Sequence, residues 1–347
     1  MFRLLVRRGV LRKCKCSSVY LSVSIFFLSF LLTVHLSTYL STTITNPQTP
    51  TNSRDPLKLS HHLLQKCLSA GVHLHHPARA IAIHTDAMHG ELSGVRIATT
   101  PTEPGVSSET ETDIPCTRLL IAAGAWSPHV FASLFPRSTA PSLPISSLAG
   151  HSLVVRSPRW AGAGVKDGGK QREEKDAKEA QVECHAVFIA APPGDGYAPE
   201  IFSRADGYIY VAGLNSAAEP LPHLPADARA GIRREAIEQL RGTARLVLGS
   251  TTDGDDDDDD EIEVIREGLC FRPATARGTP ILDRIPDAWL GPGVKTRPGA
   301  EGGVYLAAGH GPWGISLSLG TGMVMAEMMQ GREASADVGG LGFGGLV

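Results

Sequence analysis

The stretch VYLAAGHGPWGI, residues 304–315, determines how the rest of the chain is interpreted. It begins with β-formers and alanines, passes through a glycine-rich turn at residues 309–314 and continues into residues 315–330, where apolar residues recur at helical spacing. Those apolar residues are Ile315, Leu319, Met323 and Ala326. Gly331 follows, at a position where helices commonly end. The pattern predicts a strand, a tight turn and a helix.

A turn of this kind can bind an electron-rich group. The first N–H groups of a helix have no partner inside the helix, and the helix dipole favours negative charge at that end. Gly320 and Gly322 each cost about 1 kcal/mol of helix stability relative to alanine, which we interpret as room for another backbone or a flat ligand. An ordinary strand-to-helix connection has the same pattern, so this stretch alone leaves both interpretations open.

Three earlier segments join residues 309–315 and 320–322 in an ordered set. They are RLLIAAGAWS (118–127), PEIFSRADGYIY (199–210), and CFRPAT with GTPI (270–275 and 278–281). In the same order, the four segments resemble the FAD-dependent amine and amino-acid oxidoreductases, the superfamily of D-amino-acid oxidase, glycine oxidase and sarcosine oxidase. The likeness is closest to a fungal branch of oxidoreductases and covers roughly residues 55–332.

The resemblance implies an α/β chain, α+β overall, with a Rossmann-like FAD-binding domain and a second, β-rich substrate domain. Residues 51–140 and 270–332 are expected to form the FAD-binding domain, and residues 141–269 the substrate domain. The composition becomes richer in β-formers near residue 141, in agreement with this division. The glycine-rich residues 333–347 are expected to form a flexible tail.

The resemblance also implies which residues bind FAD and what the protein does. The expected cofactor-binding residues are Ala122, Ala123, Gly124, Gly309, Gly311, Pro312, Trp313, Gly314 and Ile315. The implied reaction is hydride transfer to the flavin from the C–H bond beside an amine of a small, amino-acid-like substrate.

No catalytic residue is assigned, but Arg272, His310 and Trp313 are candidates. A guanidinium binds a carboxylate through two parallel hydrogen bonds, so Arg272 is a candidate for holding an anionic group, with a structural ion pair as the alternative. Glycine-oxidase-like members carry an arginine in the turn where this chain has Pro312, and the expectation of a free α-amino acid substrate is weaker for that reason.

One family element is not found in the sequence. The resemblance implies an initial strand, a Gly-x-Gly-x-x-Gly turn and a helix that holds the pyrophosphate. The glycines at 162–164 follow no strand, and those at 340–345 precede no helix. We therefore expect an incomplete FAD-binding domain with weak FAD binding and an exposed sheet edge. The alternatives are a catalytically inactive member of the fold with a membrane-tethered or trafficking-related role, or a truncated gene product.

The first 50 residues differ from the rest. Basic residues precede an apolar run at 19–40, which is 22 residues long and carries no Asp, Glu, Lys or Arg. About 20 such residues span a bilayer as a helix, so an N-terminal hydrophobic helix and a membrane-associated protein are predicted. A targeting peptide or a misassigned exon, with a cytoplasmic protein, is the alternative.

Composition excludes several other classes of function. The net charge of −3 implies no general affinity for nucleic acid. The six cysteines show no Cys-x-x-Cys pair, and the histidines between residues 61 and 84 are spread over different predicted elements, so no metal site is expected. The charged insert at 162–181 and the acidic run at 253–261 are expected to be solvated loops, since the acidic run lacks the spacing of a calcium loop.

Hydrophobic periodicity and turn residues predict the remaining elements. A helix is expected from Asp55 to Gly71, a polar loop at residues 101–115 and one long helix at residues 225–248. Strands are expected at 72–74, 80–84, 94–98, 119–122, 151–156, 184–190 and 209–214, and residues 262–266 lead into the segment at 270–275.

Overall fold

The computed structural model describes residues 56–99, 109–158, 160, 185–190, 197–204, 206–248 and 262–344, together with the backbone of 4–7 and 20–23. The predicted insert at 162–181, the acidic run at 253–261 and most of the apolar run at 19–40 lie outside these residues.

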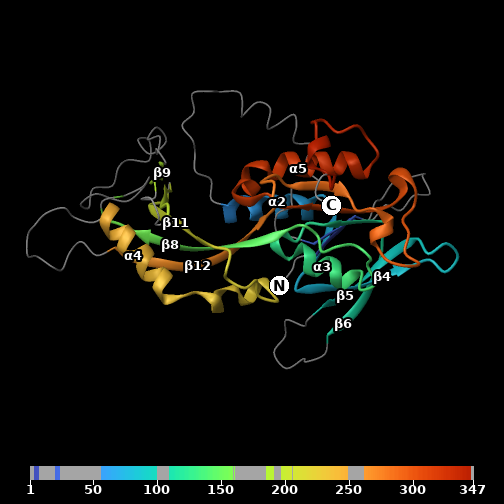
Figure 1. The fold of residues 1–347 in the computed structure, drawn as a ribbon, viewed down its shortest axis with the longest axis horizontal. Coiled ribbons are helices and arrows are strands. Elements are labelled where there is room, and N and C mark those ends of the chain that lie inside the picture. The colour runs from blue at the N-terminus through green and yellow to red at the C-terminus, as the bar shows by residue number, and fades with distance from the viewer. Residues whose placement is uncertain are drawn as a thin grey trace, which may run out of the picture.

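A six-stranded sheet lies in the right-hand part of the molecule as drawn in Figure 1. Its strands, in spatial order, are β13 (Ile281–Arg284), β14 (Gly303–Ala308), β7 (Arg118–Ile121), β2 (Tyr20–Val23), β1 (Leu4–Arg7) and β3 (Val72–His75). The strands β14, β7 and β2 run parallel, whereas β13 and β1 are antiparallel to their neighbours. The predicted strand–turn–helix at residues 304–330 is confirmed as β14 followed by helix α5, Gly314–Met329.

Two expectations about the N-terminus are corrected by this sheet. The strand β2 pairs in parallel with β7, so the edge of β7 that was expected to be exposed is occupied. Tyr20–Val23 is a strand rather than part of a hydrophobic helix. Tyrosine and valine favour strands, and pairing satisfies the backbone N–H and C=O groups on both sides. Within the described residues, no helix combines the length and apolar character needed to cross a membrane.

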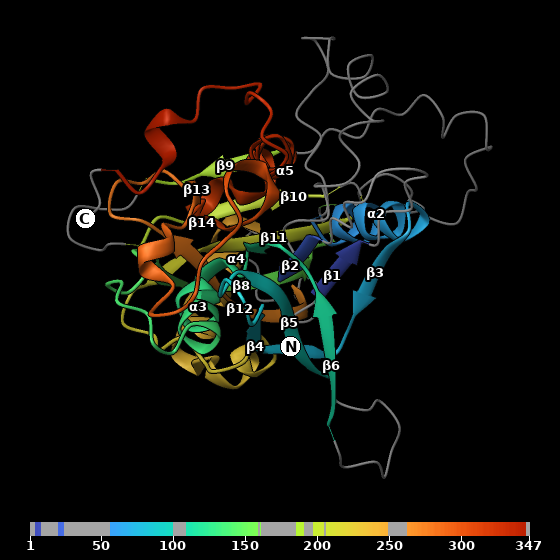
Figure 2. The same cartoon turned by 90° about the vertical axis from the view of Figure 1, so that its right-hand side faces the viewer.

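Both faces of the central strands are buried, as a continuous apolar run predicts. Leu119 and Ile121 of β7 pack with helix α3, Ser127–Leu134. Leu120 and the following Ala122 pack against Met325 and Met329 of α5 on the opposite face. Helix α2, Pro56–Ser69, lies over the β1–β3 side of the sheet and meets α5 through Leu319 (Figure 2). The sheet is thus a middle layer between helices.

A three-stranded sheet extends the α3 side of the core. It consists of β4 (Ala78–Thr85), β5 (Leu92–Thr99) and β6 (Thr110–Pro115). Residues 101–115 were predicted to be a polar loop, but Thr110–Pro115 forms β6, because it pairs with β5 over its whole length and buries Ile114. Residues 101–108 lie outside the described part of the chain.

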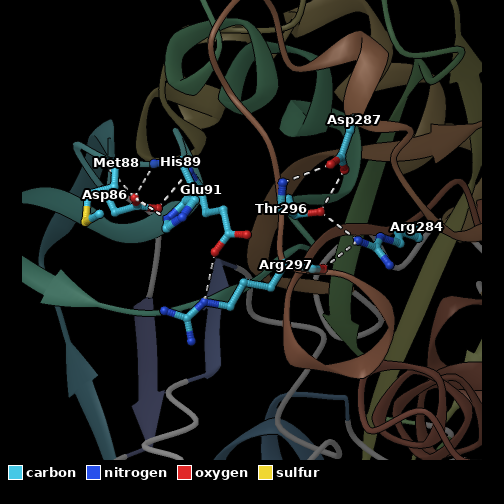
Figure 3. Close-up of polar contacts among 8 residues, drawn as sticks. All are labelled: Asp86, Met88, His89, Glu91, Arg284, Asp287, Thr296 and Arg297. Atoms are coloured by element: carbon cyan, nitrogen blue, oxygen red, sulfur yellow. Dashed lines mark hydrogen bonds and ion pairs between the residues drawn. The ribbon is translucent and has the colours of Figure 1, made fainter.

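A polar network joins the β4–β5 turn to the segment that leads into β14 (Figure 3). Asp86 accepts hydrogen bonds from the backbone N–H groups of Met88, His89 and Glu91. Glu91 pairs with Arg297 at 3.4 Å, and Asp287 accepts hydrogen bonds from the Thr296 N–H and hydroxyl at 2.8 and 2.7 Å. The network fixes the connection that positions β14 and the turn after it.

The second sheet has five strands, ordered β12 (Glu263–Ala274), β8 (Ser146–Arg156), β11 (Tyr208–Ser216), β10 (Glu200–Ser203) and β9 (Ala186–Phe188). Helix α4, Arg234–Leu248, covers one face through Ile237 and Leu240 (Figure 1). The single helix predicted at 225–248 is instead a 3₁₀ segment, Pro225–Gly231, followed by α4. The helical conformation is interrupted at Ile232, whose backbone is extended with ψ of 120°.

The C-terminal residues pack more closely than a flexible tail would. Phe343 is 6% exposed and meets Trp289 edge-on with ring centroids 4.9 Å apart. Its N–H donates to Asp283 on the outer strand β13, and Arg277 donates to the Gly342 carbonyl. The expectation of fraying fails up to residue 344 because an aromatic side chain and two hydrogen bonds hold the segment against the edge of the sheet.

Candidate functional site

Two glycine turns lie next to each other at the carboxyl ends of neighbouring strands in the six-stranded sheet. The 3₁₀ turn η2, Gly124–Trp126, follows β7, and the 3₁₀ turn η7, Gly311–Trp313, follows β14. Because β7 and β14 are parallel neighbours, the turns at their carboxyl ends meet at the same edge, where open α/β sheets bind ligands. The structure therefore brings the predicted residues 122–124 and 309–315 together.

The backbone of both turns faces open space. Gly124 and Gly311 have φ of +56° and +53°, a conformation that L side chains rarely adopt. A Cβ built on either glycine would meet no atom within 4 Å. Gly309 differs, since a Cβ there would lie 2.5 Å from Cγ2 of Thr275. Gly309 thus permits tight packing, whereas Gly124 and Gly311 leave room for a ligand to approach the backbone.

The start of α5 combines apolar surface with an uncapped helix end. No side chain caps the N-terminus of α5, which continues directly from η7, where the Trp313 N–H donates to the His310 carbonyl. Trp313 is 61% exposed and Ile315 is 44% exposed. Gly314 has ordinary helical backbone angles and serves as the first residue of the helix. An apolar surface beside uncapped N–H groups suits a flat ring with an electron-rich edge.

Strand β12, which carries Arg272, passes beside the two turns. The strand lies against both η2 and η7, and Phe271 meets Trp126 edge-on with ring centroids 5.9 Å apart. Thr275, three residues beyond Arg272, packs under Gly309. The third candidate segment, residues 270–275, therefore meets the other two at the same place.

The guanidinium of Arg272 has a neutral partner. Its Nη1 donates a hydrogen bond to Oδ1 of Asn215 on β11. Among the described residues, no carboxylate forms an ion pair with Arg272, so the structural ion pair considered from the sequence is not formed there. Within the described part of the chain, the positive charge of Arg272 is thus not paired with a negative one.

His310 is held as a neutral side chain. Burial lowers the pKa of His310 to about 4, because the surroundings disfavour the charged imidazolium. Its Nε2 lies 3.1 Å from the Thr321 hydroxyl of α5. His310 therefore links the turn to the helix and carries no charge at neutral pH.

Sequence reasoning missed two residues of this site. Trp126 was part of a matched segment without a role; its Nε1 donates to the Pro222 carbonyl at 2.8 Å and ties η2 to the loop after β11. Asn215 was not singled out, and the only signal for it was a glycine two residues earlier in a predicted strand, which is typical of a bulge. Among the described residues, no three His, Cys, Asp or Glu side chains come together as metal ligands.

The residues present fit the flavin end of FAD, the cofactor that the resemblance implies. The two open glycines, the apolar start of α5 and its uncapped N–H groups match a flat, partly anionic ring. In the described chain, no strand leads through a Gly-x-Gly-x-x-Gly turn into a helix, and Gly339–Leu341 forms a short 3₁₀ turn. The fit therefore concerns the ring and not the pyrophosphate.

Known proteins resemble this chain in both sequence and fold. A protein of Schizosaccharomyces pombe (strain 972) described as an oxidoreductase is 26% identical over 227 residues, which make up 64% of this chain and 44% of that relative. Glycine oxidase from Geobacillus kaustophilus superposes with a TM-score of 0.51 and 18% identity over 82% of this chain and 56% of its own. L-proline dehydrogenase from P. horikoshii superposes with a TM-score of 0.50 and 12% identity, over 80% of this chain and 56% of its own.

The chain thus spans about half the length of the relatives that it matches. At these identities the two solved structures show a shared fold. The family described as FAD dependent oxidoreductase (DAO) matches residues 48–328, well over half of the chain. The chain belongs to this family of FAD-dependent oxidoreductases.

Proposed function

We propose that the chain oxidises an amine or amino-acid-like small molecule with FAD as its cofactor. The observation that carries this proposal is the convergence of η2, η7 and β12, together with Arg272 on β12, which forms no ion pair with a carboxylate among the described residues. When bound, FAD supplies a ring that accepts a hydride; the protein binds and orients the reactants and adjusts the charge around them.

The backbone of the two turns would hold the flavin ring. Gly124 and Gly311 leave their backbone open to a flat group, and the N-terminus of α5 favours negative charge at the ring edge. Trp313 and Ile315 supply apolar surface that excludes water beside the ring. Ala122 and Ala123 connect β7 to η2. Ala122 packs against α5, and this contact supports the turn.

Arg272 would bind the anionic group of the substrate. A guanidinium whose only described hydrogen bond is to an amide keeps a free edge that can hold a carboxylate with two parallel bonds. Pro312 occupies the place where glycine-oxidase-like members have an arginine, and His310 is neutral, so η7 supplies no second cation. We call the place where η2, η7 and β12 meet the junction. Arg272 is therefore the anion anchor at this junction, and substrates with one carboxylate near the amine fit it.

The proton balance of the reaction favours a neutral amine. Hydride loss from the carbon beside the nitrogen requires the nitrogen lone pair, so the amine must be unprotonated before oxidation. His310 in η7 is neutral at neutral pH, because burial lowers its pKa to about 4. This side chain therefore adds no charge beside the amine.

The test is anaerobic mixing of the FAD-loaded chain with a panel of amines. Neutral primary and secondary amines, α-amino acids and N-substituted glycines should be compared by bleaching of the visible flavin band. The proposal expects bleaching by carboxylate-bearing amines, with Arg272→Gln losing it. A chain that binds FAD but is bleached by no amine would favour the alternative, a member of the fold without turnover.

A further inference from the structure

Asn215 meets Arg272 across the strand that separates them. Cys270 of β12, Gly150 of β8 and Asn215 of β11 lie opposite one another in three neighbouring strands. Arg272 is two residues further along β12, so it shares a sheet face with Cys270. Its Nη1 donates to Oδ1 of Asn215, and this bond passes over Gly150.

Gly150 leaves the space in which this hydrogen bond forms. A Cβ built on Gly150 would lie 3.0 Å from Asn215 Oδ1 and 3.3 Å from Arg272 Nη1. Both distances are tighter than ordinary contacts, so any side chain at residue 150 would push the amide and the guanidinium apart. Glycine weakens the interior of a strand, and its presence here marks a close approach of neighbouring groups.

A bulge in β11 places asparagine rather than leucine at this position. Val211 pairs with Leu153, yet Leu214 pairs with His151 and Asn215 with Gly150, so β11 contains one extra residue. Without that residue, Leu214 would lie opposite Gly150. Gly213 makes the bulge possible, with φ of +102° and a position where a Cβ would lie 2.0 Å from the Ala198 carbonyl oxygen. Bulges commonly redirect a side chain next to a functional site.

The orientation of the Asn215 amide is fixed by two partners. The guanidinium can only donate, so Oδ1 must face Arg272. The amide Nδ2 donates to the Gly213 carbonyl at 3.2 Å, within the same bulge. Asn215 is therefore held from behind and presents a neutral acceptor to the arginine. A neutral acceptor orients the guanidinium and leaves its positive charge intact. An aspartate at this position would instead offset that charge with its carboxylate.

We propose that Asn215 is a positioning residue, presented by the β11 bulge over Gly150, that orients Arg272 to bind the carboxylate of the substrate. The inference rests on the proposed function, in which Arg272 is the anion anchor. Asn215 itself acts through Arg272, and it makes the junction selective for a carboxylate over a neutral group of the same shape.

The experiment measures binding of two probes to the full chain, with and without added FAD. Benzoate carries the carboxylate, and benzamide is its neutral counterpart; both affinities are read by ligand-observed NMR. We compare the wild type with Asn215→Asp, Asn215→Leu and Arg272→Gln. Arg156→Gln serves as the control, because that guanidinium lies on the same sheet but is paired with Glu263 and Tyr208. Melting temperatures check that each variant is folded.

The expected result is a loss of affinity for benzoate with little change in the affinity for benzamide. Asn215→Asp should weaken benzoate binding at least about tenfold, since its carboxylate pairs with Arg272, and Asn215→Leu about fivefold. Benzamide binding should change less than about twofold in every variant, and the Arg156 control should match the wild type. Asn215→Asp is nearly isosteric and tests the idea even if Asn215→Leu does not fold.

Each contrary outcome has a distinct meaning. If Arg272→Gln loses benzoate while folded Asn215→Asp binds it as the wild type does, the positioning role is wrong and the anchor stands. If Arg272→Gln keeps full affinity, or the wild type binds no benzoate, Arg272 is not an anion anchor and both the inference and that part of the proposed function fail. Equal losses for benzoate and benzamide would show a general structural effect and also overturn the inference.

Discussion

His310 shows how burial determines chemistry at the scale of one residue. The sequence made it a catalytic candidate without an assigned role, and the structure holds it neutral against Thr321 with its pKa lowered to about 4. An imidazole with an ordinary pKa in the same turn would be partly charged near neutral pH and would compete with Arg272 for anions. Burial therefore keeps His310 from adding a positive charge in this turn.

The lowered pKa of His310 has a consequence for stability. In the unfolded chain this histidine takes up a proton near pH 6.5, whereas in the folded chain it does so only near pH 4. The unfolded state thus binds more protons between these values, and the free energy of unfolding should fall as the pH falls from about 6.5 to 4, by at most about 3 kcal/mol. Urea unfolding at a series of pH values measures this loss. His310→Gln should lose less than the wild type over the same interval; an identical pH dependence would contradict the assignment.

Arg272 and Asn215 show how far sequence reasoning reaches at this scale. Arg272 lies in a matched segment, and its residue type alone suggests an anion site. Asn215 could not be found in the same way, because its position opposite Gly150 depends on one extra residue in β11. A strand with strict alternation would place Leu214 there, and nothing in the local composition fixes the register of three separate strands.

At the scale of elements, apolar periodicity predicted the buried parts well. The strands around residues 119–122 and 304–308 and the helix at 314–329 are all present, and Gly331 ends that helix with φ of +69°. The elements that were missed depend on tertiary contacts. Strand β6 is polar on one side and is held by pairing with β5, and α4 begins only after the extended backbone at Ile232.

The network in Figure 3 should contribute measurably to stability. Asp287 accepts two hydrogen bonds from Thr296, which is 7% exposed. Asp287→Ala would leave those donors without an acceptor and should lower the free energy of unfolding by about 1–3 kcal/mol. Asp206→Ala is a suitable control, because Asp206 pairs with Lys58 at 3.5 Å on the surface and such pairs contribute less than about 1 kcal/mol. Equal effects of the two variants in urea unfolding would argue against a structural role for the network.

The packed C-terminal segment gives a second test at this scale. Phe343 is 6% exposed against Trp289, so Phe343→Ala should lower the free energy of unfolding by about 3 kcal/mol. Leu246 lies on α4 and is 85% exposed, so Leu246→Ala should change it by no more than about 0.5 kcal/mol. Thermal or urea unfolding of both variants provides the comparison, and a Phe343→Ala protein as stable as the wild type would mean that the segment does not pack in solution.

For the whole molecule, ordered matches between distant segments were the most informative part of the sequence. Residues 118–127, 270–275 and 309–315 are far apart in the chain, and their meeting at one sheet edge agrees with the order of the four segments. The N-terminus could not be predicted in the same way. An apolar run suits a membrane helix or a buried strand equally well, and Tyr20–Val23 pairs with β7. The division into an FAD-binding domain and a substrate domain, with boundaries at residues 140 and 270, stays a prediction.

The central claim is that the two glycine turns bind a flavin ring, and an FAD titration of three proteins tests it most directly. Gly311 and Gly299 have nearly the same φ, +53° and +55°, and a Cβ on either would meet no atom within 4 Å. Valine at either position therefore imposes similar backbone strain, but only Gly311 lies in the proposed site. Quenching of flavin fluorescence should give equal FAD affinity, within about twofold, for the wild type and Gly299→Val, and an affinity at least about tenfold weaker for Gly311→Val. Equal FAD affinity in Gly311→Val and the wild type, or no FAD binding by the wild type, would contradict the account.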